Sequence, residues 1–460
     1  MLRQADQIFT VAQMRAAEDA LIEAGTSVDA LMQVAGRGAA DYVWRVAAHH
    51  RVTVLCGPGN NGGDGYVIAE AIRERGGKVA VIAAAEPKTD AARNARALYS
   101  GEILAADAEV HGDVLIDCLF GSGLTRPLSE VHLALLQRLV ASHRHAIAVD
   151  LPSGVESDSG ALLNPDLPGF DLTIALGAWK FAHFLMPACA TLGDLRLVDI
   201  GVAPVAGAAV ALRRLHLPAP AADAHKYRRG LLAVVGGAMP GAALLACKAA
   251  QGAGAGYVKL LADQMAAPAD LVIDDAPLAE AISDERIAAL LVGPGLGRDS
   301  TARDRLSKAL HRRGPVVLDA DALLLVDKRT PQAIATPHEG EFKQLEKIFA
   351  SEGKGSKPVR ALALARASGM VIVAKGPDTV IAAPDGRIAC APRASSWLSV
   401  AGTGDVLAGA IASRLATGAE PFAAAWQGVW LHGEAARLAG PAFTAGSLAE
   451  HIPAALEACL

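Results

Sequence analysis

The chain alternates short runs of aliphatic and β-branched residues with longer segments of helical periodicity, which restricts it to the α/β class of folds. In the first half, the runs lie at 52–56, 79–82, 114–117, 146–150, 172–176 and 195–200. In the second half, they lie at 231–235, 257–261, 290–292, 316–319, 371–375 and 379–382. Most runs of the first half begin about 25 to 35 residues apart, which is the spacing of βαβ units. We therefore expect a mostly parallel sheet in the first half and a second α/β unit after it.

The two halves are separated by a segment of different character at 205–222, where prolines stand among alanines. We therefore predict two domains, at 1–210 and 220–460. In the second domain, Pro384-Asp385-Gly386 is a turn sequence between two apolar runs. It predicts a hairpin in addition to the α/β pattern.

Composition and charge exclude several classes of protein. Aromatic residues make up only 4% of the chain and 43 basic residues face 48 acidic ones without a long basic block, so we expect no nucleic-acid partner. The six cysteines are scattered without a CxxC pair, which favours reduced thiols in a cytoplasmic protein over disulfides or a zinc site. Residues 1–10 do not resemble a signal peptide, and glycines and a proline interrupt the longest uncharged stretch, 230–247. We expect no membrane association.

A glycine-rich loop follows the first apolar run. It reads Gly-Pro-Gly-Asn-Asn-Gly-Gly-Asp-Gly at 57–65, and a helical pattern follows from Tyr66. Such a turn brings backbone amides close to an anionic group. Its amide and carboxylate side chains are also hard ligands for an alkali or alkaline-earth cation. The alternative is a structural turn without a ligand.

Two further loops follow predicted strands, at 117–127 and 150–154. In an open α/β sheet, the ligand lies beyond the carboxyl ends of the strands, where these loops would meet the first one. An aspartate after a strand often only caps a helix. Asp117 and Asp150 together with Asn61 favour a site.

These three loops closely resemble the epimerase domain of the NAD(P)H-hydrate repair enzymes, over residues 10–205. The resemblance implies a Rossmann-like domain in which Asn61, Asp117 and Ser153 hold a potassium ion. It also implies that Asp150 contacts the substrate ring, and we hypothesise that Asp150 is the acid/base that interconverts the R and S hydrates. The implied pocket is lined by Asn60, Asn61, Gly62, Gly63, Asp64, Gly121, Ser122, Gly123, Leu124, Thr125, Arg126 and Pro127.

The clearest motif of the second half is Ala401-Gly402-Thr403-Gly404-Asp405 at the start of a predicted helix. Free amides at a helix start can face a developing phosphoryl charge, with a carboxylate beside the attacking hydroxyl. A simple capping turn is the alternative. Companion loops lie at 236–238, 292–297, 335–342 and 375–379. His338, in the third of these, is either a site residue or a helix cap.

This half resembles the ribokinase-like dehydratase domain of the same repair system, over residues 222–450. The resemblance implies that Asp405 is the base that frees the hydrate hydroxyl for attack on the terminal phosphate. It assigns the adenine nucleotide to Lys375, Gly376, Pro377, Asp378, Thr379 and Gly404. It assigns the hydrate to Gly295 or Gly297, His338 and Asp405, with Ala243 in addition.

The segment before the Gly-x-Gly-Asp turn departs from many relatives, because it carries Trp397 in place of small residues. The indole either stacks on the adenine or fills the interior of the domain. We favour the interior position, since core aromatics are few.

The sequence thus predicts a fused enzyme that epimerises NADH and NADPH hydrates and dehydrates the S epimer. The resemblance implies ADP as phosphoryl donor, magnesium at the phosphates, potassium at the first site and a homo-oligomer. One alternative is a ribokinase-like small-molecule kinase with a non-catalytic nucleotide-binding module in front, and another is a purely binding role for the first half. A kinase would give a stable phosphorylated product, whereas repair releases free phosphate.

Overall fold

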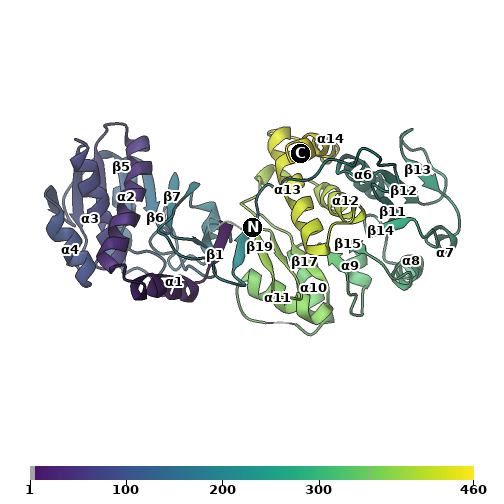
Figure 1. Ribbon diagram of the computed structural model, residues 1–460, viewed down its shortest axis with the longest axis horizontal. Helices are drawn as coiled ribbons and strands as arrows, with labels where there is room; N and C mark the ends of the chain where they lie inside the picture. The colour runs from purple at the N-terminus through teal and green to yellow at the C-terminus, as the bar shows by residue number, and fades with distance from the viewer. Residues whose placement is uncertain (1–5, 352) are drawn as a thin grey trace. The chain divides into compact units, whose positions relative to one another are not determined.

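The computed structural model describes residues 6–351 and 353–460 of the chain, as two α/β units (Figure 1). The division between the compact units falls between Ala211 and Leu212. It lies within the predicted boundary segment, 205–222. Residues 212–219, which the predicted domains left unassigned, belong to the second unit. Each unit is described by itself below.

The main sheet of the first unit is parallel throughout, in the order β4-β3-β2-β5-β6-β7-β9. This confirms the expected parallel sheet. All its strands point the same way, so their carboxyl ends lie at one edge. The strands are β2 (Val52–Cys56), β3 (Val79–Ala83), β4 (Glu102–Ala105), β5 (Gly112–Cys118), β6 (His143–Val149), β7 (Leu172–Leu176) and β9 (Asp194–Val198).

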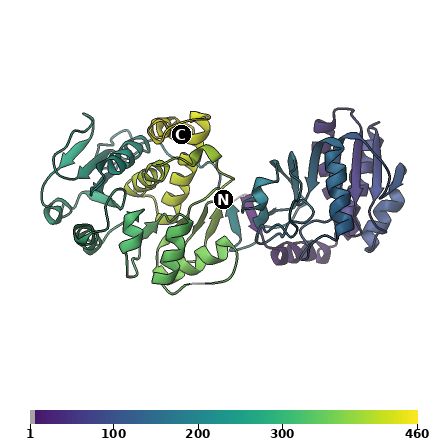
Figure 2. The same cartoon turned by 180° about the vertical axis from the view of Figure 1, so that it is seen from behind.

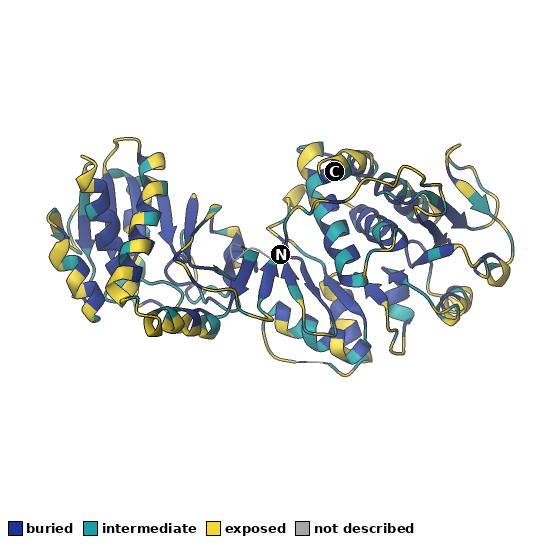
Figure 3. Cartoon of the chain, in the orientation of Figure 1, coloured by how far each residue is buried: buried dark blue, intermediate teal, exposed yellow. Residues whose placement is uncertain are grey.

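Helices cover both faces of this sheet, because its strands are apolar on both faces. Val54 of β2 packs with the helices α2, α3 and α4, whereas the next residue, Leu55, belongs to the core formed with α5. Figure 2 shows the sheet from behind, and Figure 3 shows that strands within the sheet, such as β2 and β7, are buried. The helices are α1 (Val11–Glu23), α2 (Val28–Ala47), α3 (Asn60–Glu74), α4 (Asp90–Leu98) and α5 (Glu130–Ala141).

Helix α3 begins six residues earlier than the sequence pattern predicts, at Asn60 instead of Tyr66. The sequence pattern predicts a turn for the glycines between these two residues, but in the structure they lie in the helix, where they allow close packing. A Cβ on Gly62 would lie 1.9 Å from the carbonyl oxygen of Gly57. The Asn-Asn-Gly-Gly-Asp sequence therefore forms the first turns of a helix, and its polar residues lie at the helix N-terminus.

Three short strands of the first unit pair apart from the main sheet. They are β1 (Gln7–Phe9), β8 (Trp179–Lys180) and β10 (Ala209–Ala211). Strand β1 pairs antiparallel with β10 and parallel with β8. The 3₁₀ turns η2 (Phe181–His183) and η3 (Ala188–Ala190) follow β8. This small sheet fixes the position of Lys180.

The second unit has a parallel sheet that ends in an antiparallel hairpin, in the order β13-β12-β11-β14-β15-β16-β17-β18-β19. The hairpin of β18 and β19 turns at 384–386, as predicted. The strands are β11 (Leu231–Val235), β12 (Tyr257–Leu261), β13 (Val272–Asp274), β14 (Ile287–Val292), β15 (Val316–Leu318), β16 (Ala333–Ala335), β17 (Val371–Ala374), β18 (Val380–Ala382) and β19 (Ile388–Cys390).

The helices α6, α12, α13 and α14 share one apolar core, which includes Ala249, Val406, Leu431 and Leu448. The small residues of α12 allow it to pack closely on α6. The helices are α6 (Pro240–Gly252), α7 (Leu278–Ala281), α8 (Ser300–His311), α9 (Asp321–Leu325), α10 (Glu339–Ile348), α11 (Lys357–Ser368), η4 (Ser396–Leu398), α12 (Thr403–Ala416), α13 (Pro421–Ala439) and α14 (Ala445–Glu457).

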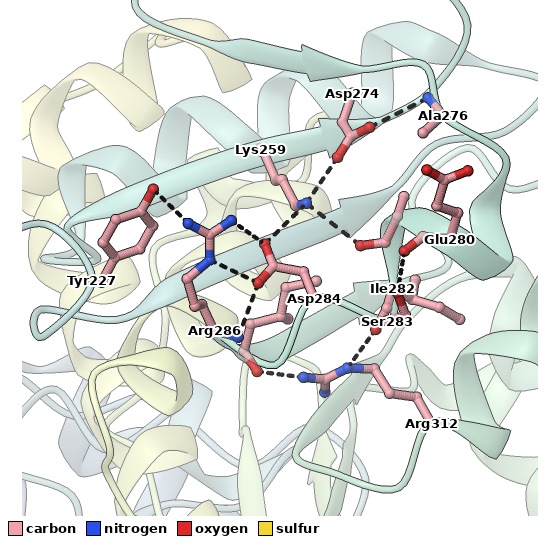
Figure 4. A network of polar contacts seen from close by, with 12 residues as sticks. Tyr227, Lys259, Asp274, Ala276, Glu280, Ile282, Ser283, Asp284, Arg286 and Arg312 are labelled. Atoms are coloured by element: carbon pink, nitrogen blue, oxygen red, sulfur yellow. Dashed lines mark hydrogen bonds and ion pairs between the residues drawn. The ribbon is translucent and has the colours of Figure 1, made fainter.

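A buried lysine ties the edge of the second sheet together (Figure 4). The Lys259 side chain, 7% exposed, donates a hydrogen bond of 2.8 Å to Asp274 and lies 3.8 Å from Asp284. Arg286 then bonds both carboxylate oxygens of Asp284 and the hydroxyl of Tyr227. The network links β12, β13 and the loop before β14, so each charge has a partner of the opposite sign.

Among residues 6–351 and 353–460, no helix combines the length and the apolar character that crossing a bilayer requires.

Two candidate active sites

The first candidate site lies where the loops after β2, β5 and β6 meet. Gly57 packs so closely on the loop after β5 that a Cβ on it would lie 1.7 Å from the carbonyl oxygen of Leu119. A Cβ on Gly121 would lie 3.1 Å from both Asn61 Oδ1 and Asp150 Oδ2. The structure therefore brings together residues from all three predicted loops.

Asn61 presents a buried amide to this junction. Neither its Oδ1 nor its Nδ2 has a hydrogen-bond partner within the described part of the chain. An unpaired buried amide costs free energy, so such a group usually awaits a ligand. The carbonyl oxygen suits a hard cation and the amino group suits an acceptor on the substrate.

Asp117 and Ser153 form a buried pair in the same site. The Ser153 hydroxyl donates to Asp117 Oδ1 at 2.7 Å, and the Ser153 amide donates to Oδ2 at 2.9 Å. The amide of Leu119 adds a third bond to Oδ1, at 3.0 Å. Burial raises the pKa of Asp117 to about 6, although these bonds favour the ionised form. With Asn61, these residues supply only oxygen ligands, which fits an alkali cation.

Asp150 is the centre of the first site. Its backbone lies in the left-handed region, with φ of 66°, directly after β6. Oδ2 accepts a bond of 2.9 Å from the amide of Ser122, and Oδ1 lies 2.5 Å from the ammonium of Lys180. Burial raises the pKa of Asp150, but the ion pair with Lys180 outweighs it and brings the pKa down to about 2. Asp150 is therefore ionised at neutral pH.

Two other carboxyl groups respond to the charge of Asp150. Burial raises the pKa of Asp64, in α3, well above its usual value, and repulsion from Asp150 adds to the effect. Burial also raises the pKa of Glu18, which α1 contributes from outside the predicted loops. The site thus contains one carboxylate held ionised, Asp150, and one carboxyl group, Asp64, for which burial favours the protonated form.

The loop 121–127 forms the open side of the site. Its residues are half-buried or exposed, so a ligand can reach them. That Asn60, Gly62, Gly63 and this loop bind the hydrate stays a prediction. Sequence reasoning missed Lys180, Glu18 and His183. The signal for Lys180 was a single cation within the apolar segment around 172–185.

The second candidate site lies at the carboxyl edge of the second sheet. Asp319 is buried after β15, and its Oδ1 accepts bonds from Thr336 Oγ1 at 2.6 Å and Lys375 Nζ at 2.7 Å. A Cβ on Gly404 would lie 3.4 Å from Lys375 Nζ. Lys375 therefore lies between a buried carboxylate and the N-terminus of α12.

Asp405 lies in the first turn of α12, after Gly402 with φ of 92°. The carboxyl group is half-buried. Burial raises its pKa to about 6, and repulsion from Asp319 adds to this while Lys375 opposes it. A carboxylate with this pKa is mostly ionised at neutral pH and is still a useful base. The motif at 401–405 thus forms a helix N-terminus that carries a base.

The predicted nucleotide turn, 375–379, is held in place by Lys357. Lys357 Nζ donates to Asp378 Oδ1 at 2.7 Å and to the carbonyl oxygens of Lys375 and Asp378. Lys357 is the first residue of α11. Its contacts give the turn a fixed shape.

His338 caps α10. The sequence leaves this role as the alternative to a site residue. Its Nδ1 accepts bonds from the amides of Gly340 and Glu341, so the ring proton is on Nε2, 3.3 Å from Glu341 Oε1. The His338 side chain is 63% exposed, and the amide of Lys375 bonds to Pro337 beside it. A contact of His338 with the hydrate stays a prediction.

Two glycine loops of the second site pack on each other. Gly295 has φ of 65°, and its carbonyl accepts a bond of 2.9 Å from the amide of Met239. The amide of Gly297 donates to Asp321 at 3.0 Å. Ala243 is completely buried in α6. The contacts predicted for Gly295, Gly297 and Ala243 with the hydrate stay predictions.

The prediction that Trp397 fills the interior is wrong. Its side chain lies in η4 and is 49% exposed. The interior needs no indole because small residues of α6 and α12 already pack against each other there. Trp397 lies between two anchored segments, since Ala394 bonds to Pro377 and Thr403 bonds to Leu398.

Both units match known protein families. Residues 28–182 match the family described as YjeF-related protein N-terminus, and residues 232–457 match NAD(P)H-hydrate dehydratase. The chain is 33% identical to the bifunctional NAD(P)H-hydrate repair enzyme of Moorella thermoacetica, over 89% of this chain and 88% of that protein. It is 35% identical to the enzyme of the same name from Gloeobacter violaceus, over 92% of each chain.

Among solved structures, the chain is similar to an ADP/ATP-dependent NAD(P)H-hydrate dehydratase from Bacillus subtilis, co-crystallised with ATP and Mg²⁺. The identity is 28%, with 53% of this chain and 95% of that chain covered and a TM-score of 0.46. The full-length matches to the repair enzymes include both units in one protein. The chain therefore belongs to the family of bifunctional NAD(P)H-hydrate repair enzymes.

Proposed function

We propose that the first unit interconverts the R and S hydrates of NADH and NADPH, and that the second unit dehydrates the S hydrate with ADP as phosphoryl donor. The observation that supports this best is that each unit gathers a carboxylate and a lysine at the carboxyl edge of its own sheet. In the first unit they are Asp150 and Lys180, and in the second Asp405 and Lys375. Two acid/base sites in one chain fit two successive reactions on one metabolite.

Epimerisation requires that the ring carbon–oxygen bond breaks and reforms on the opposite face. The leaving hydroxyl takes up a proton and departs as water, and the water that adds gives a proton back. We assign the acceptance of that proton to Asp150, whose ionised carboxylate also faces the positive charge left on the ring. We assign the supply of the proton for the departing hydroxyl to Asp64, because burial and repulsion from Asp150 raise its pKa. A proton that passes from Asp150 back to Asp64 restores both groups for the next turnover.

Asn61, Asp117 and Ser153 would hold the potassium ion. Their fit rests on the orphaned Oδ1 of Asn61 and on the carboxylate–hydroxyl pair of Asp117 and Ser153. When bound, the ion supplies positive charge beside the anionic substrate. The chain's own residues fix the loops, because Ser153 accepts a bond of 2.8 Å from the amide of Phe120.

In the second unit, Asp405 takes the proton of the hydrate hydroxyl as the oxygen attacks the terminal phosphorus of ADP. The P–O bond to AMP breaks, and the hydrate becomes a phosphate ester. Loss of inorganic phosphate and of a ring proton then restores the reduced nicotinamide. Lys375 and the amides at the start of α12 face the transferred phosphoryl group. Magnesium, held through the phosphates, would neutralise part of their charge.

One experiment tests both activities. A mixture of R and S hydrates of NADH is incubated with potassium, magnesium and either ADP or ATP, and reduced nicotinamide, phosphate and AMP are measured. Complete recovery with ADP and release of phosphate supports the proposal. Recovery that stops near the S fraction contradicts the epimerase assignment, judged against spontaneous epimerisation. A stable phosphorylated product would instead favour a small-molecule kinase. Recovery with ATP alone refutes ADP as donor.

A further inference from the structure

Lys180 is a charged side chain enclosed inside the first unit. Its side chain is 1% exposed, and its ammonium has two acceptors, Asp150 Oδ1 at 2.5 Å and the carbonyl oxygen of Leu176 at 2.7 Å. Enclosing an ammonium group costs several kcal/mol unless it is paired. A chain that needs only stability does as well with apolar residues, so a lysine at this position calls for another explanation.

The backbone around Lys180 is held as firmly as its side chain. The amide of Lys180 donates to His183 Nδ1 at 2.8 Å, which leaves the ring proton on Nε2. Nε2 then donates to the carbonyl oxygen of Asp150 at 2.9 Å. Burial, with the Lys180 charge, lowers the pKa of His183 to about 4, so the ring is neutral and keeps this tautomer. His183 thus connects the backbones of Lys180 and Asp150.

These contacts leave one oxygen of Asp150 for the substrate. Oδ1 is bonded to Lys180 and directed toward the interior. Oδ2 accepts a bond from the amide of Ser122, and it lies on the side of Asn61 and Gly121. The two oxygens of one carboxylate therefore have separate tasks.

We propose that Lys180 is a positioning residue of the epimerase, which fixes Oδ1 of Asp150 so that Oδ2 faces the hydrate. This inference rests on the proposed function, because it assumes that Asp150 acts on the hydrate. Lys180 does not touch the substrate itself. It acts through Asp150, and His183 supports it by joining the two backbones.

The titratable groups that face Asp150 also determine how the loss of Lys180 would change the pKa of Asp150. They are Lys180 from β8, His183 from η2, Asp64 from α3 and Glu18 from α1. Among these, Lys180 is the cation, His183 is neutral, and the carboxyl groups disfavour a further negative charge. Removing the ammonium would leave a buried carboxylate among acidic neighbours, and the pKa of Asp150 would rise. Lys180 thus sets both the orientation and the ionisation of Asp150.

The test measures epimerase kcat and its pH profile in Lys180→Met, Lys180→Gln and Lys180→Arg. With Lys180→Met, we expect kcat at pH 7 to fall at least ~100-fold, and the acid limb of the profile to move up by about 1 to 3 pH units. Lys180→Gln keeps a donor for Oδ1 and replaces the methionine variant if that variant does not fold. We expect the same change in its pH profile. Lys180→Arg keeps the charge and is expected to leave the acid limb in place, with a lower kcat.

Lys78→Met serves as the matched control, because Lys78 is an exposed lysine of the same unit. Dehydration of pure S hydrate by the same samples gives the amount of active enzyme. If Lys180→Met or Lys180→Gln keeps the wild-type pH profile, the inference about Lys180 is wrong while the epimerase assignment stands. If the unmodified chain does not accelerate epimerisation at all, the proposed function fails first, and the role of Lys180 fails with it.

Discussion

Replacing Asp405 with asparagine is expected to stabilise the second unit at neutral pH while it abolishes dehydration. Burial is the main cause of the raised pKa of Asp405, and repulsion from Asp319 adds to it. A folded-state pKa above the unfolded value means that the fold disfavours the ionised form. The contribution of the Asp405 carboxyl group to stability is therefore full below about pH 4 and is lost as the pH rises through about 6. Asparagine avoids that loss because it does not ionise.

The size of the effect follows from the two pKa values. A rise in the pKa of Asp405 from 3.8 to about 6 corresponds to a loss of about 3 kcal/mol of stability if it applied in full. Asp405 is only half-buried, so solvent screening reduces the expected gain to about 1 to 2 kcal/mol. For a unit of this size, the melting temperature is expected to rise by roughly 2 to 8 °C.

The assay compares the melting temperatures of wild type and Asp405→Asn at pH 7 and at pH 4.5. The difference should fall to roughly a third to a half of its pH 7 value at pH 4.5, because the carboxyl group is then protonated in the folded chain but still mostly ionised in the unfolded chain. Dehydration of S hydrate by the variant should fall by about 10² to 10⁴-fold. Wild-type kcat at pH 5 should be about a tenth of its plateau, since a group with a pKa near 6 is about one-tenth ionised there.

Asp405→Glu is the control, because it keeps a carboxylate at this position. Epimerisation by the same samples shows whether the first unit is intact. An equal melting difference at both pH values would refute the ionisation argument. Dehydration near the wild-type rate in Asp405→Asn would refute the assignment of Asp405 as the base.

Three further predictions concern the second unit. Lys357→Met should raise the KM for ADP about tenfold with little change in kcat, because Lys357 shapes the 375–379 turn without facing the phosphoryl group. An unchanged KM in steady-state kinetics would contradict this role of Lys357. Trp397→Ala should leave thermal stability nearly unchanged and weaken nucleotide binding by about 1 to 3 kcal/mol if the indole stacks on adenine, as titration calorimetry can measure. Lys259→Met should lower the free energy of unfolding by about 3 kcal/mol in urea titrations, because it leaves Asp274 and Asp284 without their shared cation. A loss below about 1 kcal/mol would show that solvent already screens the network.

The position of the first site could be predicted from the sequence because it depends on local signals. Asp117, Asp150 and the glycine-rich turn each follow an apolar run, and parallel strands bring their carboxyl ends to one edge. The same reasoning placed Asp405 at a helix start. Such predictions need only the order of strands and turns along the chain.

Features that depend on packing could not be predicted in this way. The start of α3 at Asn60 depends on how closely Gly62 approaches Gly57, which periodicity does not show. The pairing of Lys180 with Asp150 joins residues that no local pattern connects. The scarcity of core aromatics favours an interior position for Trp397, although the interior is already filled by small residues.

Strands β4, β13 and β16 were also missing from the predicted runs. Strand β4 is a mostly exposed edge strand of only four residues, and β13, with three residues, is likewise exposed or half-buried. Strand β16 is fully buried but has only three residues, Ala333–Ala335, two of which are alanines of low strand propensity. The hydrophobic pattern therefore identifies long strands within a sheet better than its edges or its shortest strands.

The pairing of β1 with β10 has a consequence for how the first unit forms during synthesis. Gln7 and Val205, which exchange two hydrogen bonds, are 198 residues apart in the chain. At about 5 to 20 residues per second, the ribosome needs roughly 10 to 40 s between making one and the other. Over that time the first strand has no partner on its β10 side. The small sheet that carries Lys180 is thus completed only when nearly the whole unit has been made, which places the epimerase site among the last parts of this unit to form.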